Sequence, residues 1–430
     1  MSIILGLTRV TKLLSFIGNP ETHLQVIHIA GTNGKGSVCS YISSVLQQIP
    51  NAKIGKFTTP HLIHVTDSIS VNEIPISDGT YRRLRKEVEN INKLNSLECT
   101  EFEIMTCTAL KYFHNIKCKW CVIEVGLGGR LDATNVIPGV NKKACGITKI
   151  GLDHESFLGN TLQQIASEKA GIITKGVKFV AIDGTNAKEV LKVVEDRCKE
   201  IKDCVLQITE ANGSNWIAET QSWGTVNLSH LPLNGQYQIF NSRVAVSILD
   251  NLQQRSLLKI SIDQLLSGFS KVEWPGRLQE FIYKHDLEED SVSFLMDGAH
   301  NGSAAIELSN FLKTKYGPSQ PLTFVLAVTN GKTLQPLLDP LLSAKDNVVV
   351  TEFESVDGMP WIKAMDSTEL KSKIQEYTSS IYIDVSVPEA LKHASEISKL
   401  KNTPIVVCGS LYLCGQILRL QNNQTAKSNF

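Results

Sequence analysis

The residues Gly31-Thr-Asn-Gly-Lys-Gly-Ser37 have the types and spacing needed to bind a phosphate group. A short apolar run before them predicts a buried strand, and apolar residues at helical spacing over 38–49 predict a helix after them. A strand, a glycine-rich turn and a helix in this order bring backbone N–H groups and a helix N-terminus to one point, where an anion is stabilised. Lys35 adds a cation there, and the hydroxyl of Ser37 or Thr32 can face a magnesium ion.

The match to the general phosphate-loop pattern G-x-x-x-x-G-K-[ST] is incomplete. Aligned on Gly34 and Lys35, the pattern asks for glycine at position 29 and a hydroxyl residue at position 36, where the chain has Ile29 and Gly36. The alternative is a glycine turn that only packs a helix on a sheet. Because strand, lysine, serine and helix occur in register, we favour phosphate binding. The loop indicates a nucleotide but no particular reaction.

Length and composition favour an ordinary globular enzyme. With 430 residues the chain is long enough for two or three domains. Lysine plus arginine and aspartate plus glutamate number 43 each, so charge gives no argument for a nucleic-acid or membrane partner. No apolar run reaches the roughly 18–20 residues of a membrane span. The N-terminus lacks the pattern of a secretory signal, so we expect a cytoplasmic protein, although Arg9 and Lys12 leave a mitochondrial location open.

The ten cysteines lie in apolar surroundings, as in a reduced cytosolic protein. Cys118 and Cys121 form a C-x-x-C pair, but no second pair follows at the spacing of a zinc site. The pair also runs directly into an apolar strand. We therefore expect buried strand cysteines here.

Strands and helices alternate from residue 23 to about 210, which predicts an α/β domain with a mainly parallel sheet covered on both faces. Ligands of such sheets gather at the carboxyl ends of the strands. Three further motifs fall at predicted strand ends: Thr58-Thr-Pro-His-Leu62, Glu124-Val-Gly-Leu-Gly-Gly-Arg130 with Asp132 and Asn135 after it, and Asp153-His154-Glu155.

Each of these motifs has an ordinary structural alternative, such as a turn, a loop or a hydrogen-bonded histidine. Hard oxygen ligands and one imidazole nevertheless recur at successive strand ends beside a phosphate loop. Thr59, Glu124 and His154 could hold magnesium, with nucleotide oxygens and water completing an octahedron. Lys169, in the last turn of a predicted helix over 161–170, is by local pattern a solvated residue that stabilises the helix dipole.

The C-terminal part of the chain predicts a second, smaller α/β domain. Trp274-Pro-Gly-Arg277 interrupts the earlier pattern, and a charged stretch follows it. We divide the chain into a nucleotide-binding P-loop domain, residues 1–283, and a Rossmann-like domain, residues 284–430. Asp297-Gly-Ala-His-Asn301 follows the first strand of the second set, and Gly409-Ser-Leu-Tyr412 follows the last.

Taken together, the motifs resemble those of the Mur ligase superfamily, specifically its folate branch of dihydrofolate synthetases and folylpolyglutamate synthetases. The likeness is greatest to the monofunctional dihydrofolate synthetases of fungal type. The motifs run in the family's order from residue 28 to 301 and are Gly31–Ser37, Thr58–Leu62, Val122–Gly129, Asp153-His154, Glu168–Ile172, Trp274–Arg277 and Asp297–Asn301. The order Lys35-Gly36-Ser37 is the family's own form of the loop.

The resemblance implies roles for the matching residues. Those that would contact ATP are Asn33, Gly34, Lys35, Gly36, Ser37, Asn241, Arg277 and Asp297. Thr59, where many relatives carry serine, would bind magnesium with Glu124 and His154. Lys169 matches a lysine that relatives carry as a carbamate, which helps to hold a second magnesium ion. The residues implied in catalysis are Lys35, His154, Lys169 and His300.

The implied reaction is ATP-driven ligation of L-glutamate to dihydropteroate in folate biosynthesis, which feeds one-carbon metabolism. An acyl phosphate would form first, and the products would be dihydrofolate, ADP and phosphate. We expect a monomer whose partners are these small molecules, with two magnesium ions and ATP as co-substrate.

Two other functions stay open. A folylpolyglutamate synthetase, or a bifunctional enzyme, would add glutamate to tetrahydrofolate. The stretch 99–105 resembles a pterin-side segment of dihydrofolate-making relatives, where Phe102 could stack on a flat ring or be an ordinary core residue. A more remote alternative is a P-loop nucleotide switch, which would act on nucleotide without regard to glutamate. The metal-type residues and the second domain argue against a switch.

Overall fold

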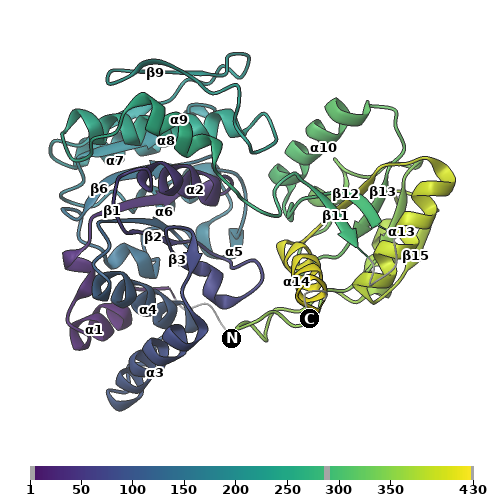
Figure 1. Ribbon diagram of the computed structural model, residues 1–430, viewed down its shortest axis with the longest axis horizontal. Coiled ribbons are helices and arrows are strands. Elements are labelled where there is room, and N and C mark those ends of the chain that lie inside the picture. Colours follow the sequence, from purple (N-terminus) through teal and green to yellow (C-terminus); the bar gives the residue numbers. More distant parts are fainter. Residues whose placement is uncertain (1–4, 285–290, 428–430) are drawn as a thin grey trace. The chain divides into compact units, whose positions relative to one another are not determined.

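The computed structural model describes residues 5–284 and 291–427. Contacts divide the chain into two compact units. Unit 1 comprises residues 1–61, 66–232 and 236–274, and unit 2 comprises residues 62–65, 233–235 and 275–430. Each unit is built around its own sheet (Figure 1).

The sheet of unit 1 has eight strands in the order β4-β3-β2-β5-β1-β6-β7-β8. The six neighbouring strands β2, β5, β1, β6, β7 and β8 run parallel. Strand β3 is antiparallel to β2, and β4 is antiparallel to β3. This confirms the predicted mainly parallel sheet. The strands are β1 (Val26–Ala30), β2 (Ile54–Phe57), β3 (Ile69–Val71), β4 (Ile74–Pro75), β5 (Trp120–Glu124), β6 (Lys142–Ile147), β7 (Phe179–Ile182) and β8 (Val205–Ile208).

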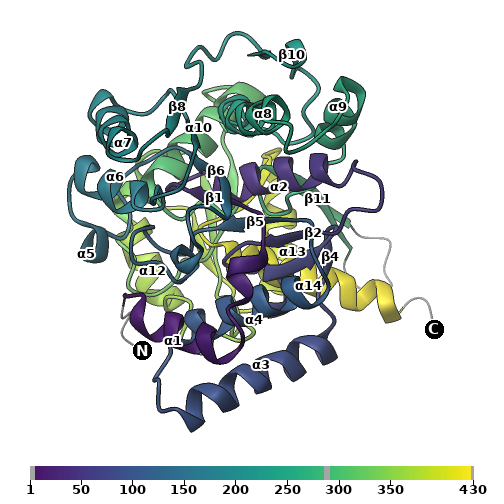
Figure 2. The same ribbon diagram turned by 90° about the vertical axis from the view of Figure 1, so that its left-hand side faces the viewer.

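Helices cover both faces of this sheet, with α2, α8 and α9 on one face and α1, α3 and α4 on the other (Figure 1 and Figure 2). Glycines in the strands allow close packing, since Gly55 meets Phe113 of α4 and Gly146 meets Ile248 of α8. A small hairpin of β9 (Ile217–Thr220) and β10 (Gly224–Asn227) precedes α8. The helices are α1 (Thr8–Phe16), α2 (Lys35–Leu46), α3 (Asp78–Leu94), α4 (Glu101–Asn115), α5 (Glu155–Leu158), α6 (Leu162–Ala170), α7 (Lys188–Glu200), α8 (Gln238–Gln254) and α9 (Ile262–Ser270), with 3₁₀ turns at Pro20–His23, Val65–Ser68 and Ala133–Val136.

The sheet of unit 2 has six strands in the order β11-β12-β16-β13-β14-β15. All neighbours pair in parallel except β11, which is antiparallel to β12. The strands are β11 (Gln279–Lys284), β12 (Ser291–Met296), β13 (Thr323–Leu326), β14 (Asn347–Val350), β15 (Ile381–Ile383) and β16 (Ile405–Cys408). The helices are α10 (Gly302–Tyr316), α11 (Gln335–Leu338), α12 (Ser367–Ile374), α13 (Val387–Lys401) and α14 (Leu411–Lys427). Residues of α13 and α14 share one buried apolar core with β12, β13, β14 and β16.

The sequence did not predict the two edge strands of unit 2, β11 and β15. Strand β11 pairs with β12 over its whole length, from Gln279 opposite Met296 to Lys284 opposite Ser291. The contact boundary therefore falls after Trp274, before β11. The functional division into 1–283 and 284–430 stays a prediction, and part of the charged stretch, residues 285–290, lies outside the described residues.

Two other features concern the C-x-x-C pair and the search for membrane-spanning helices. Cys118 and Cys121 are both buried, as expected for this strand. In the part of the chain that the structure describes, every helix is too short or too polar to cross a membrane.

Candidate active site

The strand order of unit 1 places four motifs along one edge of the sheet. Strands β2, β5, β1 and β6 are parallel neighbours, so their carboxyl ends lie on the same side. Thr59 follows β2, Glu124 ends β5, the phosphate loop follows β1, and His154 lies beyond β6. This is the edge at which such sheets bind ligands.

The phosphate loop is a tight turn that opens helix α2. Gly34 stands at the N-cap with φ +90°, and α2 begins at Lys35. The backbone N–H groups of Thr32 and Asn33 both donate to the carbonyl of Lys149, at 2.9 and 3.1 Å. The turn is thus hydrogen-bonded to the end of the neighbouring strand, and the N-terminus of α2 points to the same edge.

Asn241 on α8 packs directly against this turn. An ideal Cβ built on Gly34 would lie 2.2 Å from the Asn241 side-chain oxygen, so only glycine fits there. The Asn241 amide donates to Gln238 Oε1 at 3.0 Å, and Gln238 Nε2 donates to Ser37 Oγ at 3.4 Å. Gln238 is fully buried. Sequence reasoning missed it, although its place three residues before Asn241 on one helix face could have drawn attention to it.

Glu124 connects the loop to the end of β2. Its carboxylate is buried. One oxygen lies 3.8 Å from the Lys35 ammonium, and the other accepts the Thr59 backbone N–H at 3.1 Å. Lys35 also donates to the Thr32 carbonyl at 3.1 Å. The structure therefore brings Thr59, Glu124 and Lys35 together, as the sequence predicted from their strand-end positions.

His154 is more exposed than the other predicted ligands. Its side chain is 45% exposed, and its Nε2 lies 3.9 Å from an oxygen of Asp153. Within residues 5–284 and 291–427, the structure forms no cluster of three or more His, Cys, Asp or Glu side chains able to hold a metal ion. Magnesium usually takes only one or two protein carboxylates and completes its shell with substrate phosphates and water. The buried oxygen donor of Glu124 fits an ion shared in this way with a nucleotide.

Lys169 contradicts its local interpretation as a solvated helix-end residue. Its side chain is buried, and its ammonium donates to the Gly31 carbonyl at 2.7 Å. Burial and the nearby positive charge of Lys35 lower the pKa of Lys169 to about 7. The neutral amine is therefore readily available at this position.

The loop after Glu124 holds the end of α6, which carries Lys169. The Arg130 backbone N–H donates to the Glu168 carbonyl at 2.7 Å. Asn135 donates to the Gly171 carbonyl at 3.1 Å and accepts from the buried Lys142 ammonium at 2.5 Å. These contacts use carbonyls that a helix C-terminus leaves unpaired, and they place Lys169 beside the phosphate loop.

In unit 2, Asp297, Arg277 and His300 lie together at the end of β12. The Asp297 carboxylate accepts the backbone N–H groups of Leu278 and Ala299, each at 2.8 Å. Burial raises the pKa of Asp297, and the nearby Arg277 opposes that rise. His300 Nδ1 is 2.9 Å from the Gly298 carbonyl. Asp297 thus holds the backbone turn that carries Arg277 against the turn that carries His300.

Phe102 occupies a position that suits either of its two interpretations. It lies on α4 and is half-buried. An ideal Cβ on Gly126 would lie 2.4 Å from the tip of its ring, and its ring stacks with that of Phe57 at a centroid distance of 6.2 Å. The ring therefore packs near the end of β5, two residues beyond Glu124.

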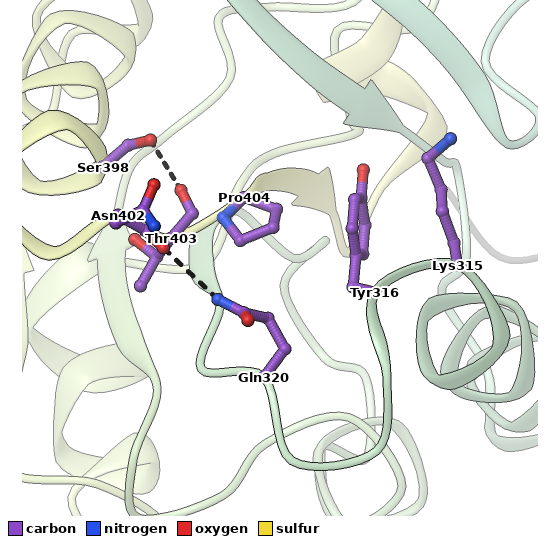
Figure 3. Close-up of a pocket in the computed structure, with 7 residues that line it drawn as sticks. All are labelled: Lys315, Tyr316, Gln320, Ser398, Asn402, Thr403 and Pro404. Carbon is purple, nitrogen blue, oxygen red and sulfur yellow. Dashed lines mark hydrogen bonds between the residues drawn. The ribbon is translucent and has the colours of Figure 1, made fainter.

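A hollow of about 500 Å³ in unit 2 lies elsewhere in the fold (Figure 3). Gln320 and Pro404 line it and precede β13 and β16, so the hollow lies at the amino ends of these strands. Asp297 lies at the opposite end of the sheet, beside the carboxyl end of β16. Ser398 and Gln320 already donate to the carbonyls of Thr403 and Asn402. The hollow is separate from the predicted site residues.

Comparison with known proteins decides the family. The model for the Mur ligase middle domain matches residues 29–249, and that for the dihydrofolate synthetase C-terminal domain matches residues 279–420. Dihydrofolate synthetase of Saccharomyces cerevisiae is 56% identical over 98% of this chain and 99% of its own length. The chain belongs to the folate branch of the Mur ligase superfamily.

Two further relatives in the folate branch have lower identity to this chain. A probable folylpolyglutamate synthase of Saccharomyces cerevisiae is 38% identical over 97% of each chain. The solved structure of Mycobacterium tuberculosis folylpolyglutamate synthase complexed with ADP and AMPPCP matches with a TM-score of 0.81 and 28% identity, covering 96% of this chain and 95% of that one. The two-sheet α/β fold is therefore that of the folate branch.

Replacing Gly34 with alanine tests the phosphate loop of this Mur ligase. A methyl group there would collide with Asn241 and strain a left-handed backbone, so we expect at least about tenfold weaker Mg–ADP binding in calorimetric titration. Gly79→Ala is the matched control, because its Cβ meets no atom within 4 Å. Equal affinities of both variants and the parent chain would contradict this location for the nucleotide.

Proposed function

We propose that the chain is an ATP-dependent ligase that joins L-glutamate to dihydropteroate. The observation that carries this proposal is its 56% identity, over nearly the full length of both chains, to a dihydrofolate synthetase. Identity to the probable folylpolyglutamate synthase of the same yeast is only 38% over similar coverage. The products are dihydrofolate, ADP and phosphate.

The nucleotide phosphates bind at Asn33–Ser37. Support comes from the N-terminus of α2, whose first N–H groups face this turn, and from the nearby Lys35 ammonium. Asn241, which packs on Gly34, also contacts the nucleotide. Arg277 is a further residue that we assign to the nucleotide. Asp297 shares that role, and it also fixes the Arg277 turn through its two backbone hydrogen bonds.

Thr59, Glu124 and His154 contribute to binding magnesium, and two ions take part. The buried Glu124 carboxylate supports this assignment, since it is a hard oxygen donor next to the phosphate loop. Magnesium held by these residues would neutralise charge on the phosphoryl group during transfer.

Lys169 carries a carbamate, formed when its neutral amine attacks carbon dioxide and loses a proton. Burial beside Lys35 supports this, because it favours the neutral amine. The resulting anion offers oxygens for the second magnesium ion and a negative charge near Lys35.

The reaction requires activation because a carboxylate is a poor acyl donor. The dihydropteroate carboxylate attacks the γ-phosphorus of ATP, which releases ADP and leaves an acyl phosphate. The glutamate amine then attacks the acyl carbon, loses a proton and displaces phosphate from the tetrahedral intermediate. Lys35 stabilises the transferring phosphoryl group, and His154 and His300 lie in motifs assigned to catalysis.

The second candidate function is addition of glutamate to tetrahydrofolate. The half-buried Phe102 ring beside Gly126 is compatible with a pterin in either substrate. A nucleotide switch remains the remote alternative. We expect the chain to be a monomer and to be located in the cytoplasm.

Turnover assays separate the substrates. With ATP and L-glutamate, we expect the purified chain to release ADP when dihydropteroate is supplied, and Lys35→Ala or His154→Ala to lower that rate about a hundredfold or more. Lys93→Ala, on the exposed face of α3, is the control. Turnover with tetrahydrofolate alone would overturn the choice of substrate, and ADP release indifferent to glutamate would favour the switch.

The carbamate can be observed without activity. Equilibration with ¹³C-labelled bicarbonate should give a carbamate resonance in the NMR spectrum that is lost in Lys169→Gln, because a pKa of about 7 leaves much of this buried amine neutral at neutral pH. Lys192→Gln is the control, since Lys192 is exposed. The same resonance in Lys169→Gln and the parent chain would rule out carbamylation at Lys169.

A further inference from the structure

The indole of Trp274 packs directly on the phosphate loop. An ideal Cβ on the buried Gly36 would lie 2.2 Å from Trp274 Cζ2 and 3.0 Å from Cε2. The ring therefore occupies the space that a side chain at position 36 would need. This explains in physical terms why glycine stands where the general phosphate-loop pattern has a hydroxyl residue.

A buried cation also contacts the indole. The Lys56 ammonium lies 5.4 Å from the centroid of the Trp274 ring, within the range in which the face of an indole attracts a cation. Lys56 is only 5% exposed and is paired with Glu73. A buried ammonium in this position is costly unless its partners are fixed, which favours a defined arrangement.

The partners of Lys56 are fastened to α2, the helix that the phosphate loop opens. Glu73 accepts from the Ser43 hydroxyl at 2.7 Å and from Gln47 at 3.1 Å, and both residues lie on α2. Lys56 itself is 3.5 Å from the Ser40 hydroxyl on the same helix. Through Lys56 and Glu73 the indole is therefore connected to α2 as well as to the loop that opens this helix.

Trp274 also occupies a particular place in the chain. It is the last residue of unit 1, and Pro275 is the first residue of the long final segment of unit 2. Proline fixes its own φ and keeps the preceding residue extended, so the chain leaves the indole in a restricted direction. Arg277 follows two residues after Pro275.

We propose that Trp274 is a positioning residue that anchors the connection between the units to the phosphate loop. By seating on Gly36, the indole couples nucleotide binding at the loop to the placement of Arg277. This inference rests on the proposed function, because Arg277 affects turnover only if the chain is an ATP-dependent ligase. An indole that merely covers apolar surface would have no energetic coupling to Arg277.

A double-mutant cycle measures that coupling. We expect Trp274→Ala to lower kcat/KM for ATP about tenfold or more in the parent chain, but less than about threefold in the Arg277→Ala background. Trp274→Phe, which keeps a flat ring on Gly36, should retain most of the activity. Additive losses from Trp274→Ala and Arg277→Ala, or a Phe variant as poor as the Ala variant, would overturn the proposal.

Trp223→Ala is the matched control for loss of a tryptophan from unit 1. Its indole donates to the Ile260 carbonyl at 3.2 Å and belongs to none of the predicted site motifs. We expect its kcat/KM for ATP to stay within about threefold of the parent value. A loss equal to that of Trp274→Ala would mean that the effect is general destabilisation.

Tryptophan fluorescence gives a second readout that needs neither turnover nor a destabilising variant. Titration with Mg–ADP should change the emission of the parent chain and of Trp223→Phe, but not that of Trp274→Phe. If Trp274→Phe showed the same emission change as the parent chain, the proposal would be contradicted. If the parent chain bound Mg–ADP with this response but did not turn over dihydropteroate, the proposed function would fail while the contact to the loop stood.

Discussion

The site of unit 1 is arranged around the contacts of the buried Glu124 carboxylate. It lies 3.8 Å from the Lys35 ammonium and accepts the backbone N–H of Thr59. A carboxylate taken out of water is costly unless it is paired and hydrogen-bonded, so these partners must be held in place. The parallel sheet does this, because β2, β5 and β1 are neighbours and end at the same edge. A bound nucleotide and its magnesium would meet charges that are already oriented.

The same logic accounts for the buried amine of Lys169. Its own hydrogen bond goes to the Gly31 carbonyl, and the carbonyls at the end of its helix are held by the loop that follows Glu124. Burial beside a second lysine disfavours the ammonium form. One edge of the sheet thus carries the Lys35 cation, the Glu124 anion and the Lys169 amine, whose pKa is lowered. That combination suits the transfer of a phosphoryl group to a carboxylate.

Much of this arrangement could be predicted from the sequence, for specific reasons. Strand-end motifs in an alternating α/β pattern must converge, so the proximity of Lys35, Thr59 and Glu124 followed from order alone. The burial of Lys169 did not, because a lysine in a last helical turn is usually solvated, and the loop that covers it is distant in sequence. Gln238 and Trp274 were missed because their contacts join residues some 200 or more positions apart: Gln238 hydrogen-bonds Ser37, and Trp274 packs on Gly36. Strands β11 and β15 lie at sheet edges, where the apolar pattern is weakest.

In the reaction that we propose, ATP activates the dihydropteroate carboxylate as an acyl phosphate before glutamate attacks. Dihydropteroate labelled with ¹⁸O in its carboxylate tests this most directly, with the released phosphate analysed by mass spectrometry after turnover. Formation and displacement of an acyl phosphate must transfer one carboxylate oxygen to phosphate, so the product phosphate should carry one ¹⁸O for each dihydrofolate formed. Phosphate released without ¹⁸O, while dihydrofolate accumulates, would contradict the mechanism.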